Sequence, residues 1–207
     1  MSGMRHTKKL IGGYTPSRRL GRGKYGVCYL AADIRGQEVV LKRFCRRPNK
    51  KKLHDLPENY HEAKKGYTLE QLLFKQHHKV STREFFCIGS QPAGILAYIH
   101  SRSVVHGDLR LSNVLYDGRS VSLIDFGLSR YEGTEGLKFD LDYACFGNIL
   151  LYLLYSNYPK KGKSAWYDEL PLTRAQKEYL MRLLRLMPPF LSITDAEKEF
   201  CRIWSPD

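Results

Sequence analysis

The chain has 207 residues, 43% of them hydrophobic, and its 34 Lys and Arg against 21 Asp and Glu give a net charge of +13. This length and apolar content argue against a disordered chain and predict one large domain, or two small lobes that share a cleft. The five cysteines are odd in number and never form a C-x-x-C pair, so neither a disulfide framework nor a zinc site is indicated. A reducing compartment is the simplest location, and we expect the protein in the cytoplasm.

No stretch of the chain predicts a signal peptide or a membrane span. The N-terminal "MSGMRHTKKLIGGYTPS" contains only a two-residue apolar step, where a signal peptide needs a longer apolar region. The longest apolar run, "ACFGNILLYLLY" at 144–155, is too short to cross a bilayer. We therefore expect this run to form a buried helix.

The first half of the chain predicts strands followed by helices. Residues 15–43 read as a β-meander of three strands, with a glycine turn in "IRGQ" at 34–37. The polar, lysine-rich segment 44–66 predicts at most a short helix. Leucines at helical spacing predict a helix over 68–76.

A second helical stretch is expected from residue 81 onwards, because Ser81 and Glu84 have the spacing of a capping box. Pro92 is expected to interrupt this helix, and helical spacing resumes over 94–102. "YDGRS" at 116–120 reads as a tight turn between two apolar strands.

The last third of the chain reads as helices joined by loops. These are expected at 139–155, 173–187 and 194–204. Thr194 or Asp195 is the expected N-cap of the last helix. The order is thus a small β-rich part followed by a larger helical part.

The stretch "LGRGKYGVCYL" at 20–30 has the spacing G-x-G-x-x-G. Glycines at these positions let backbone N–H groups approach phosphates, although the spacing alone is a weak signal. A dinucleotide-binding loop would continue into a helix, whereas a β-branched, aromatic run follows here. Lys42 follows sixteen residues after Gly26, at the end of "VVLK". This order predicts a phosphate-covering hairpin with a cation beneath it.

A second pattern occurs in "VVHGDLRLSNVLYDGRSVSLIDFGLSR" at 104–130. Asp108, Asn113 and Asp125 stand at the ends of strand-like runs, where turn chemistry does not require them. Together, residues 20–42 and 104–130 resemble the eukaryotic-type protein kinase-like superfamily. "DYACFG" at 142–147 also resembles the start of the buried central helix of the kinase large lobe.

The resemblance implies an α+β, bilobal protein kinase-like fold. It would consist of a compressed, β-rich N-lobe over 15–66 and a larger, mainly helical C-lobe over 67–207. Residues 1–14 would form an N-terminal tail. Only 65 residues separate Lys42 from Asp108, which is short for the family.

The resemblance also implies roles for individual residues. Asp108 would accept the proton of the attacking hydroxyl, and Arg110 stands where protein kinases usually place a lysine that touches the γ-phosphate. Asn113 and Asp125 would hold two Mg²⁺ ions, or Mn²⁺, through oxygen atoms. The residues implied in ATP binding are Leu20, Gly21, Gly23, Gly26, Val27 and Lys42.

Lys42 needs a carboxylate partner, for which Glu62 and Glu58 are the two candidates. His106 is expected to be a structural residue. Gly107 replaces the arginine by which many regulated kinases bind a phosphorylated activation loop, so we expect no control by that route. "HGDL" resembles the small atypical kinases, such as the RIO kinases and the kinase of the tRNA-threonylcarbamoyl complex, and aminoglycoside phosphotransferases.

The peptide-docking part of a typical protein kinase is expected to be reduced, because only fourteen residues separate Gly127 from Asp142 and no Ala-Pro-Glu motif appears. The expected function is an ATP- and Mg²⁺-dependent transfer of phosphate to Ser or Thr hydroxyls of a protein or of the chain itself.

A second hypothesis is a pseudokinase-like module that binds an acidic protein or RNA. It is motivated by the compressed small lobe, and binding would use the run "KRFCRRPNKKK" at 42–52, which holds seven positive charges in eleven residues. A solvated loop explains the run equally well. A third hypothesis is a small-molecule kinase for a cationic substrate. It would need an acidic pocket, whereas the C-terminal region is rich in basic residues, namely Lys160, Lys161, Lys163, Arg174, Arg182 and Arg185.

Overall fold

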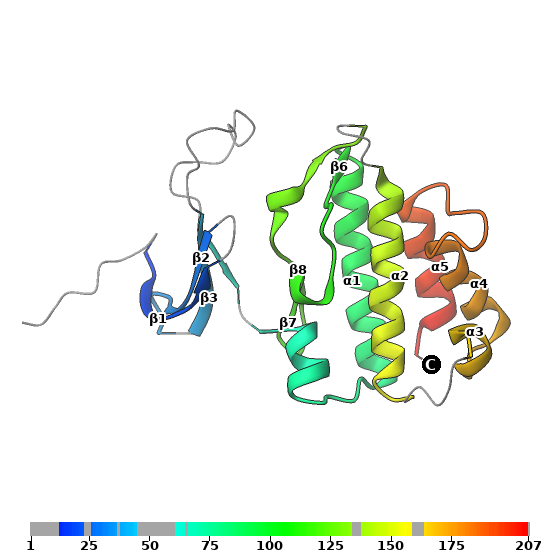
Figure 1. Cartoon of the computed structure of the whole chain (residues 1–207), viewed down its shortest axis with the longest axis horizontal. Helices are drawn as coiled ribbons and strands as arrows, with labels where there is room; N and C mark the ends of the chain where they lie inside the picture. The colour runs from blue at the N-terminus through cyan, green and yellow to red at the C-terminus, as the bar shows by residue number, and fades with distance from the viewer. Residues whose placement is uncertain are drawn as a thin grey trace, which may run out of the picture. The chain divides into compact units, whose positions relative to one another are not determined.

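The computed structural model describes residues 13–22, 26–36, 38–44, 61–64, 66–133, 138–158 and 164–206. The chain divides into two compact units, an N-terminal unit of residues 1–66 and a C-terminal unit of residues 67–207. The described elements of the first unit are strands, and helices predominate in the second (Figure 1). The expected α+β fold, with a small β-rich part followed by a larger helical part, is confirmed.

The N-terminal unit contains a four-stranded antiparallel sheet in the order β1-β2-β3-β4. Its strands are β1 (Thr15–Arg22), β2 (Gly26–Ala32), β3 (Glu38–Phe44) and β4 (His61–Lys64). The predicted meander is therefore correct. The turn between β2 and β3 closes through the N–H of Gly36, which donates to the carbonyl oxygen of Asp33 at 3.0 Å.

One face of this sheet carries a small core. Ala31 pairs with Val39, and both are buried together with Leu41 on the same strand as Val39. Alternate residues of a strand point to opposite faces, so this burial pattern fixes the register of β2 against β3. For the segment 44–66 we expected no more than a short helix. Its residues 61–64 instead form strand β4. Residues 45–60 lie outside the described residues.

The C-terminal unit is organised around two long helices, α1 (Thr82–His100) and α2 (Phe139–Tyr155). In Figure 1 they run side by side, with β6, β7 and β8 along one flank and α3, α4 and α5 along the other. The flanking helices are α3 (Trp166–Glu169), α4 (Arg174–Leu183) and α5 (Ile193–Trp204). This arrangement buries apolar side chains of all the longer helices in one core.

Aromatic rings join α1 to α5 inside this core. The ring of Phe200 on α5 lies 5.9 Å from that of Phe85 and stacks at 6.0 Å on that of Phe86. Gly89 permits this approach, because a Cβ at that position would overlap the ring of Phe200. The sequence pattern did not predict this close packing of α1 against α5.

Pro92 does not interrupt the helix, contrary to expectation. Helix α1 continues through it from Thr82 to His100, and Pro92 is one of its buried residues. A proline inside a helix removes one hydrogen bond and disturbs the preceding turn. Burial of the α1 face against α2 and α5 outweighs that local cost, since most helical stability in proteins comes from tertiary packing.

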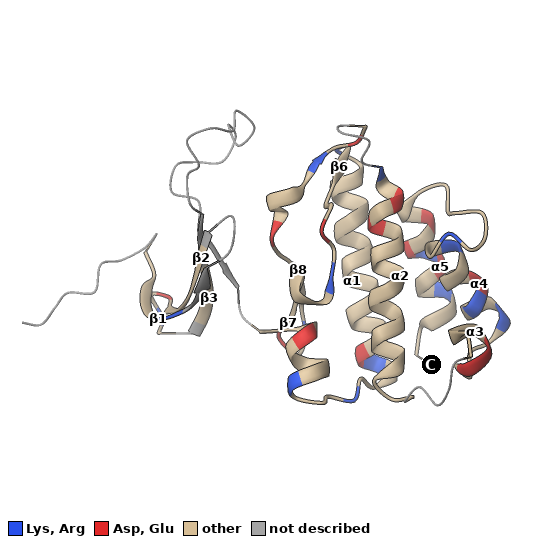
Figure 2. Cartoon of the chain, in the orientation of Figure 1, with Lys and Arg blue, Asp and Glu red and all other residues tan. Residues whose placement is uncertain are grey.

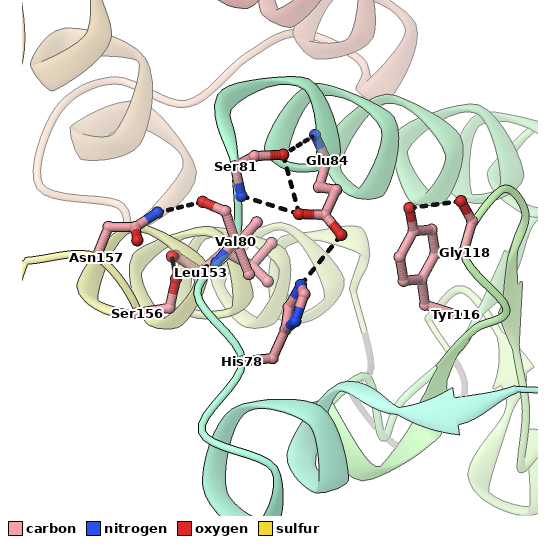
Figure 3. Close-up of polar contacts among 9 residues, drawn as sticks. All are labelled: His78, Val80, Ser81, Glu84, Tyr116, Gly118, Leu153, Ser156 and Asn157. Atoms are coloured by element: carbon pink, nitrogen blue, oxygen red, sulfur yellow. Dashed lines mark hydrogen bonds and ion pairs between the residues drawn. The ribbon is translucent and has the colours of Figure 1, made fainter.

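The start of α1 has the predicted capping box (Figure 3). The side chain of Ser81 accepts from the N–H of Glu84 at 3.2 Å, and Glu84 in return accepts from the N–H of Ser81 at 3.0 Å. His78 contacts the other carboxylate oxygen of Glu84 at 3.0 Å. The helix start is thereby fixed in position.

The same segment is tied to the end of α2 (Figure 3). The N–H of Val80 donates to the hydroxyl of Ser156 at 3.0 Å, and the side-chain amide of Asn157 donates to the carbonyl oxygen of Val80. These contacts hold the start of α1 and the end of α2 together.

Helix α5 begins differently from the expectation. Its N-cap is Ser192, whose hydroxyl accepts from the N–H of Asp195 at 3.1 Å, whereas Thr194 and Asp195 were the expected caps. Ser192 satisfies the N–H of the third helical residue, which is the usual geometry of a serine cap. Within the described segments, no helix is long and apolar enough to cross a membrane.

Candidate active site

Short strands fold the stretch 104–130 back on itself. Strand β6 (Val104–Val105) pairs with β9 (Arg130–Tyr131), so the two ends of the stretch lie together. Between them, β7 (Val114–Tyr116) pairs with β8 (Val121–Leu123) across the predicted turn at 116–120. Strand β7 also pairs with β5 (Tyr67–Thr68), which completes a three-stranded sheet.

This strand pairing brings three polar residues of the stretch, Asp108, Asn113 and Asp125, to one corner of the C-terminal unit. Asn113 ends a short 3₁₀ turn, η2 (Leu111–Asn113), directly before β7. The N–H of Ile124, which follows β8, donates to the carbonyl oxygen of Asn113 at 2.9 Å. Asp125 directly follows Ile124 in the chain, so this hydrogen bond holds Asp125 close to Asn113.

Asn113 also fixes the side chain of Asp108. Its amide nitrogen donates to the Asp108 carboxylate oxygen Oδ2 at 3.0 Å and to the Asp108 carbonyl oxygen at 2.8 Å. Asn113 is buried, with 7% of its surface exposed, while Asp108 is half-buried. The carboxylate of Asp108 is therefore held in a defined direction while part of it remains accessible to solvent.

Asp125 has a left-handed backbone, with φ 64° and ψ 58°. This conformation costs a residue other than glycine about 1–3 kcal/mol, although Asp and Asn tolerate it best. It leads directly into the 3₁₀ turn η3 (Phe126–Leu128). The ring of Phe126 then packs on that of His106, with centroids 4.6 Å apart, so the two loops are in contact.

His106 is fully buried at 0% exposure. The N–H of Asp108 donates to its Nδ1 at 3.3 Å, which requires that nitrogen to be unprotonated. Burial lowers the pKa of His106, and the carboxylates of Asp142, Asp108 and Asp125 oppose this effect only in part. His106 is consequently held neutral, in agreement with its expected structural role.

Asp142 is a buried carboxylate that organises the loop from beneath. It lies on α2 with 0% exposure and accepts from the N–H groups of His106 at 2.7 Å and Gly107 at 3.0 Å. Its Oδ2 atom also lies 2.9 Å from Nε2 of His100, at the end of α1. Three donors thus compensate a charge that would otherwise be costly to bury.

Sequence reasoning marked Asp142 only as part of the motif "DYACFG", and it missed His100 altogether. A histidine at the end of an apolar helix carries no pattern of its own. The contact that gives His100 its role joins residues 42 positions apart in the chain.

Gly107 is required by the backbone at this point. Its φ is +76°, and a Cβ there would lie 3.0 Å from the carbonyl oxygen of Leu128. The hydroxyl of Ser129 donates to the carbonyl oxygen of His106 at 3.0 Å, which ties the same two segments together. The loop therefore rests directly on the segment after Asp125, and a side chain at position 107 would push the two apart.

The expected ATP-binding residues lie in the N-terminal unit. Leu20 and Gly21 belong to β1, and Gly26 and Val27 belong to β2, with Arg22 opposite Val27 across the hairpin. Val27 is buried at 6% exposure. Gly23 lies outside the described residues.

Lys42 lies on β3, directly opposite Cys28 of β2 and Glu62 of β4 in the strand register. Residues opposite one another in antiparallel strands share a face of the sheet. Glu62 thus stands on a strand, in a segment for which at most a short helix was expected. Glu58, the other candidate, lies outside the described residues.

The donor atoms at the corner formed by Asp108, Asn113 and Asp125 suit a hard cation. They are carboxylate and amide oxygens, which Mg²⁺ prefers over nitrogen or sulfur. In the described ranges, no three His, Cys, Asp or Glu residues are grouped as a metal site. Few protein ligands are characteristic of Mg²⁺ bound with a nucleotide, since the ion keeps several waters and takes phosphate oxygens as further ligands. The residues present fit that mode of binding.

Comparison with known proteins agrees with this geometry. The model of the protein kinase domain matches residues 58–139, which include the whole corner just described. A protein of Bacillus subtilis (strain 168), named "Probable serine/threonine-protein kinase YbdM", is 31% identical over 204 aligned residues, which cover 80% of this chain and 79% of the relative. The maize protein "Probable serine/threonine-protein kinase CCRP1" is 23% identical, over 88% of this chain and 40% of its own length.

The chain therefore belongs to the protein kinase family. Members of this family use ATP and a divalent metal ion. The narrower resemblance of "HGDL" to the RIO and tRNA-complex kinases and to aminoglycoside phosphotransferases is not confirmed by these matches.

Proposed function

We propose that the protein transfers the γ-phosphoryl group of ATP to a Ser or Thr hydroxyl of a protein substrate, or of its own chain. The observation that supports this most directly is the pair of hydrogen bonds by which Asn113 holds Asp108. A half-buried carboxylate fixed in this way is suited to orient a hydroxyl and to accept its proton. The Bacillus subtilis relative is itself named as a probable serine/threonine kinase.

Each predicted site residue has a task in such a transfer. Asp108 accepts the hydroxyl proton on a carboxylate oxygen, a role worth about 10²–10⁴ in rate. Arg110, exposed two positions further on, provides a fixed positive charge for the γ-phosphate. Asn113 and Asp125 supply oxygen ligands for Mg²⁺ or Mn²⁺. The bound metal ion and ATP would supply charge neutralisation of the triphosphate and the group to be transferred.

Lys42 is assigned to the α- and β-phosphates, with Glu62 as its partner. The support is the strand register, which sets the two residues directly opposite each other on β3 and β4. A partner held by strand pairing would not depend on the movement of a helix. The glycines at 21, 23 and 26, with Leu20 and Val27, would cover the nucleotide.

An acidic partner for the N-terminal unit is a second proposal, which the comparisons do not support. It rests on charge, because residues 1–66 hold 17 Lys and Arg against 5 Asp and Glu, a net charge of +12, whereas residues 67–207 hold 17 against 16. The exposed described cations of this unit are Arg18, Arg19 and Arg35. Most of the run 42–52 lies outside the described residues.

A small-molecule kinase finds no support in the comparisons either. Two basic residues of the C-terminal region are paired with acidic side chains. Arg174 pairs with Glu178 at 2.7 Å, and Arg185 pairs with Asp140 at 3.3 Å. Figure 2 shows positive and negative residues interspersed over α4 and α5. A location in the cytoplasm remains a prediction from cysteine usage.

The test is transfer of labelled phosphate. Purified protein is incubated with γ-labelled ATP and Mg²⁺, with and without a generic basic protein, beside the variants Asp108→Asn and Asp117→Asn. Asp117 is an exposed acid of the turn between β7 and β8, so its variant is a matched control. We expect label from the native protein and from Asp117→Asn, and none from Asp108→Asn. Transfer by Asp108→Asn at the native rate would contradict the proposal.

A further inference from the structure

Beside the loop that carries Asp108, the C-terminal unit has a hollow of about 380 Å³. Its walls come from the loop itself, through Leu109, Arg110 and Leu111, from the helical turn after β5, and from the exposed side of α2. The hollow therefore begins at the residue that follows Asp108. It lies at the lower end of the size range of ligand sites, large enough for one bulky side chain.

Two exposed aromatic rings stand at this hollow. Phe74, on η1 (Gln71–Lys75), is 53% exposed, and Tyr152, on α2, is 50% exposed. Their rings meet edge to face, with centroids 5.8 Å apart and planes at 89°. Large aromatic surfaces left in water gain most from a ligand that covers them, and a third ring can join such a pair edge-on.

The remaining lining combines apolar residues with two uncharged polar ones, Ser112 and Asn148, and one charged residue of each sign. Ile149 is buried at the base, and burial raises the pKa of the Cys145 thiol beyond its usual value, with Asp142 and Asp108 raising it further. That thiol is neutral and acts as a small apolar group. The two charged residues of the lining, Glu70 and Arg110, are of opposite sign. A cationic side chain would meet the repulsion of Arg110 as well as the attraction of Glu70.

We propose that this hollow binds an aromatic or large aliphatic side chain of the protein substrate, and that Phe74 and Tyr152 thereby select the sequence that is phosphorylated. The inference rests on the proposed kinase function, because it needs a hydroxyl at Asp108. Charge balance and aromatic walls favour an uncharged occupant over Lys or Arg.

The place of this side chain in the substrate follows from chain geometry. Arg110 is two residues from Asp108, so their Cα atoms are at most about 7 Å apart. An extended peptide covers that distance in two residues. The selected side chain therefore stands about two to four positions from the phosphorylated Ser or Thr.

The experiment uses the full chain and a peptide library with a central Ser or Thr, in which each flanking position is fixed in turn as Phe, Leu, Ala, Glu or Arg. Transfer from γ-labelled ATP is measured for the native protein and for Phe74→Ala, Tyr152→Ala and Tyr152→Phe. Tyr98→Ala is the matched control, because Tyr98 is a 60% exposed tyrosine on α1 that does not line the hollow.

We expect Phe or Leu at one such position to raise kcat/KM about tenfold over Ala. Phe74→Ala and Tyr152→Ala should lose most of this preference through KM, with kcat and the rate on Ala peptides unchanged. Tyr152→Phe and Tyr98→Ala should keep it.

Two results overturn the inference while leaving the kinase function standing. The first is transfer that shows no preference for an apolar side chain, including transfer that prefers Arg. The second is an apolar preference that is as strong in both Phe74→Ala and Tyr152→Ala as in the native protein. Transfer to no peptide and to no protein, by native chain that binds ATP, would instead overturn the proposed function and this inference with it.

Discussion

The carboxylate of Asp142 accepts a hydrogen bond from the backbone N–H of Gly107 at 3.0 Å, although 35 positions separate the two residues in the chain. Through this fully buried carboxylate, the central helix α2 holds the loop of Asp108 on one side, while Leu128 and Ser129 contact it from another side. The direction of the Asp108 side chain depends on both supports. This relationship determines the first two predictions.

The first prediction concerns Asp142→Asn. The variant replaces a buried charge that faces three donors by an amide that can accept on one side only, so the donors of the loop lose partners. We expect a loss of about 3–5 kcal/mol in the free energy of unfolding, and loss of phosphate transfer. Urea denaturation measures the former. Asp140→Asn, on the same helix with a partly exposed ion pair to Arg185, should cost under about 1 kcal/mol. Equal losses for both variants would contradict the role of Asp142.

The second prediction concerns Gly107→Ala, compared with Gly118→Ala. Both glycines have positive φ, +76° and +96°, so each alanine costs about 1–2 kcal/mol in backbone strain. Only at position 107 does the added Cβ meet a neighbour, the carbonyl oxygen of Leu128; position 118 is open. Gly107→Ala should therefore also lower the transfer rate, whereas Gly118→Ala should not. Thermal unfolding and labelled-ATP assays separate the two effects, and matching transfer rates would show that the contact with Leu128 is unimportant.

The third prediction concerns Lys42 and Glu62. Lys42→Met should reduce transfer by about 10²–10³, as expected for removing one charge from a phosphate site. Glu62→Gln should raise KM for ATP about two- to fivefold, the size of a cross-strand ion pair. In a Lys42→Met background, Glu62→Gln should have no further effect, because the pair is already broken. Glu38→Gln, opposite Ala32 on the same strand as Lys42, is the control. An undiminished effect of Glu62→Gln in the double variant would rule out the pairing.

The fourth prediction is a pH dependence of stability. Burial lowers the pKa of His106 from the usual 6.5, so below that pH the unfolded chain binds a proton that the folded chain does not. The stabilisation is complete above about pH 6.5 and is lost as the pH falls from there through the lower pKa of the folded state. His106→Asn keeps an acceptor for the N–H of Asp108 and should flatten this part of the curve.

Urea midpoints between pH 5 and 8, without nucleotide or metal, measure this dependence. His77→Gln, at an exposed histidine, should retain the native slope. A native protein whose midpoint does not fall from pH 6.5 to 5, or a His106→Asn curve that falls just as steeply, would contradict the prediction.

The sequence by itself determined the elements of local character. The residues of 15–43 predicted a meander of three strands, the Ser81 and Glu84 spacing predicted the start of α1, and "YDGRS" at 116–120 predicted the turn of the hairpin. Such features depend on neighbours in the chain, so the residues carry the information themselves. The motif spacings of 20–42 and 104–130 also indicated the family, which the relatives confirm.

Only the tertiary structure decided what depends on distant partners. Pro92 stays inside a helix because its buried face packs on other helices, and Glu62 lies opposite Lys42 because β4 pairs with β3. The role of His100, the need for glycine at 107, and the meeting of Phe74 with Tyr152 all join residues more than 20 positions apart. A sequence pattern records what each residue prefers locally, whereas these contacts arise only when the folded chain brings separate segments together, where packing and buried hydrogen bonds outweigh local preference.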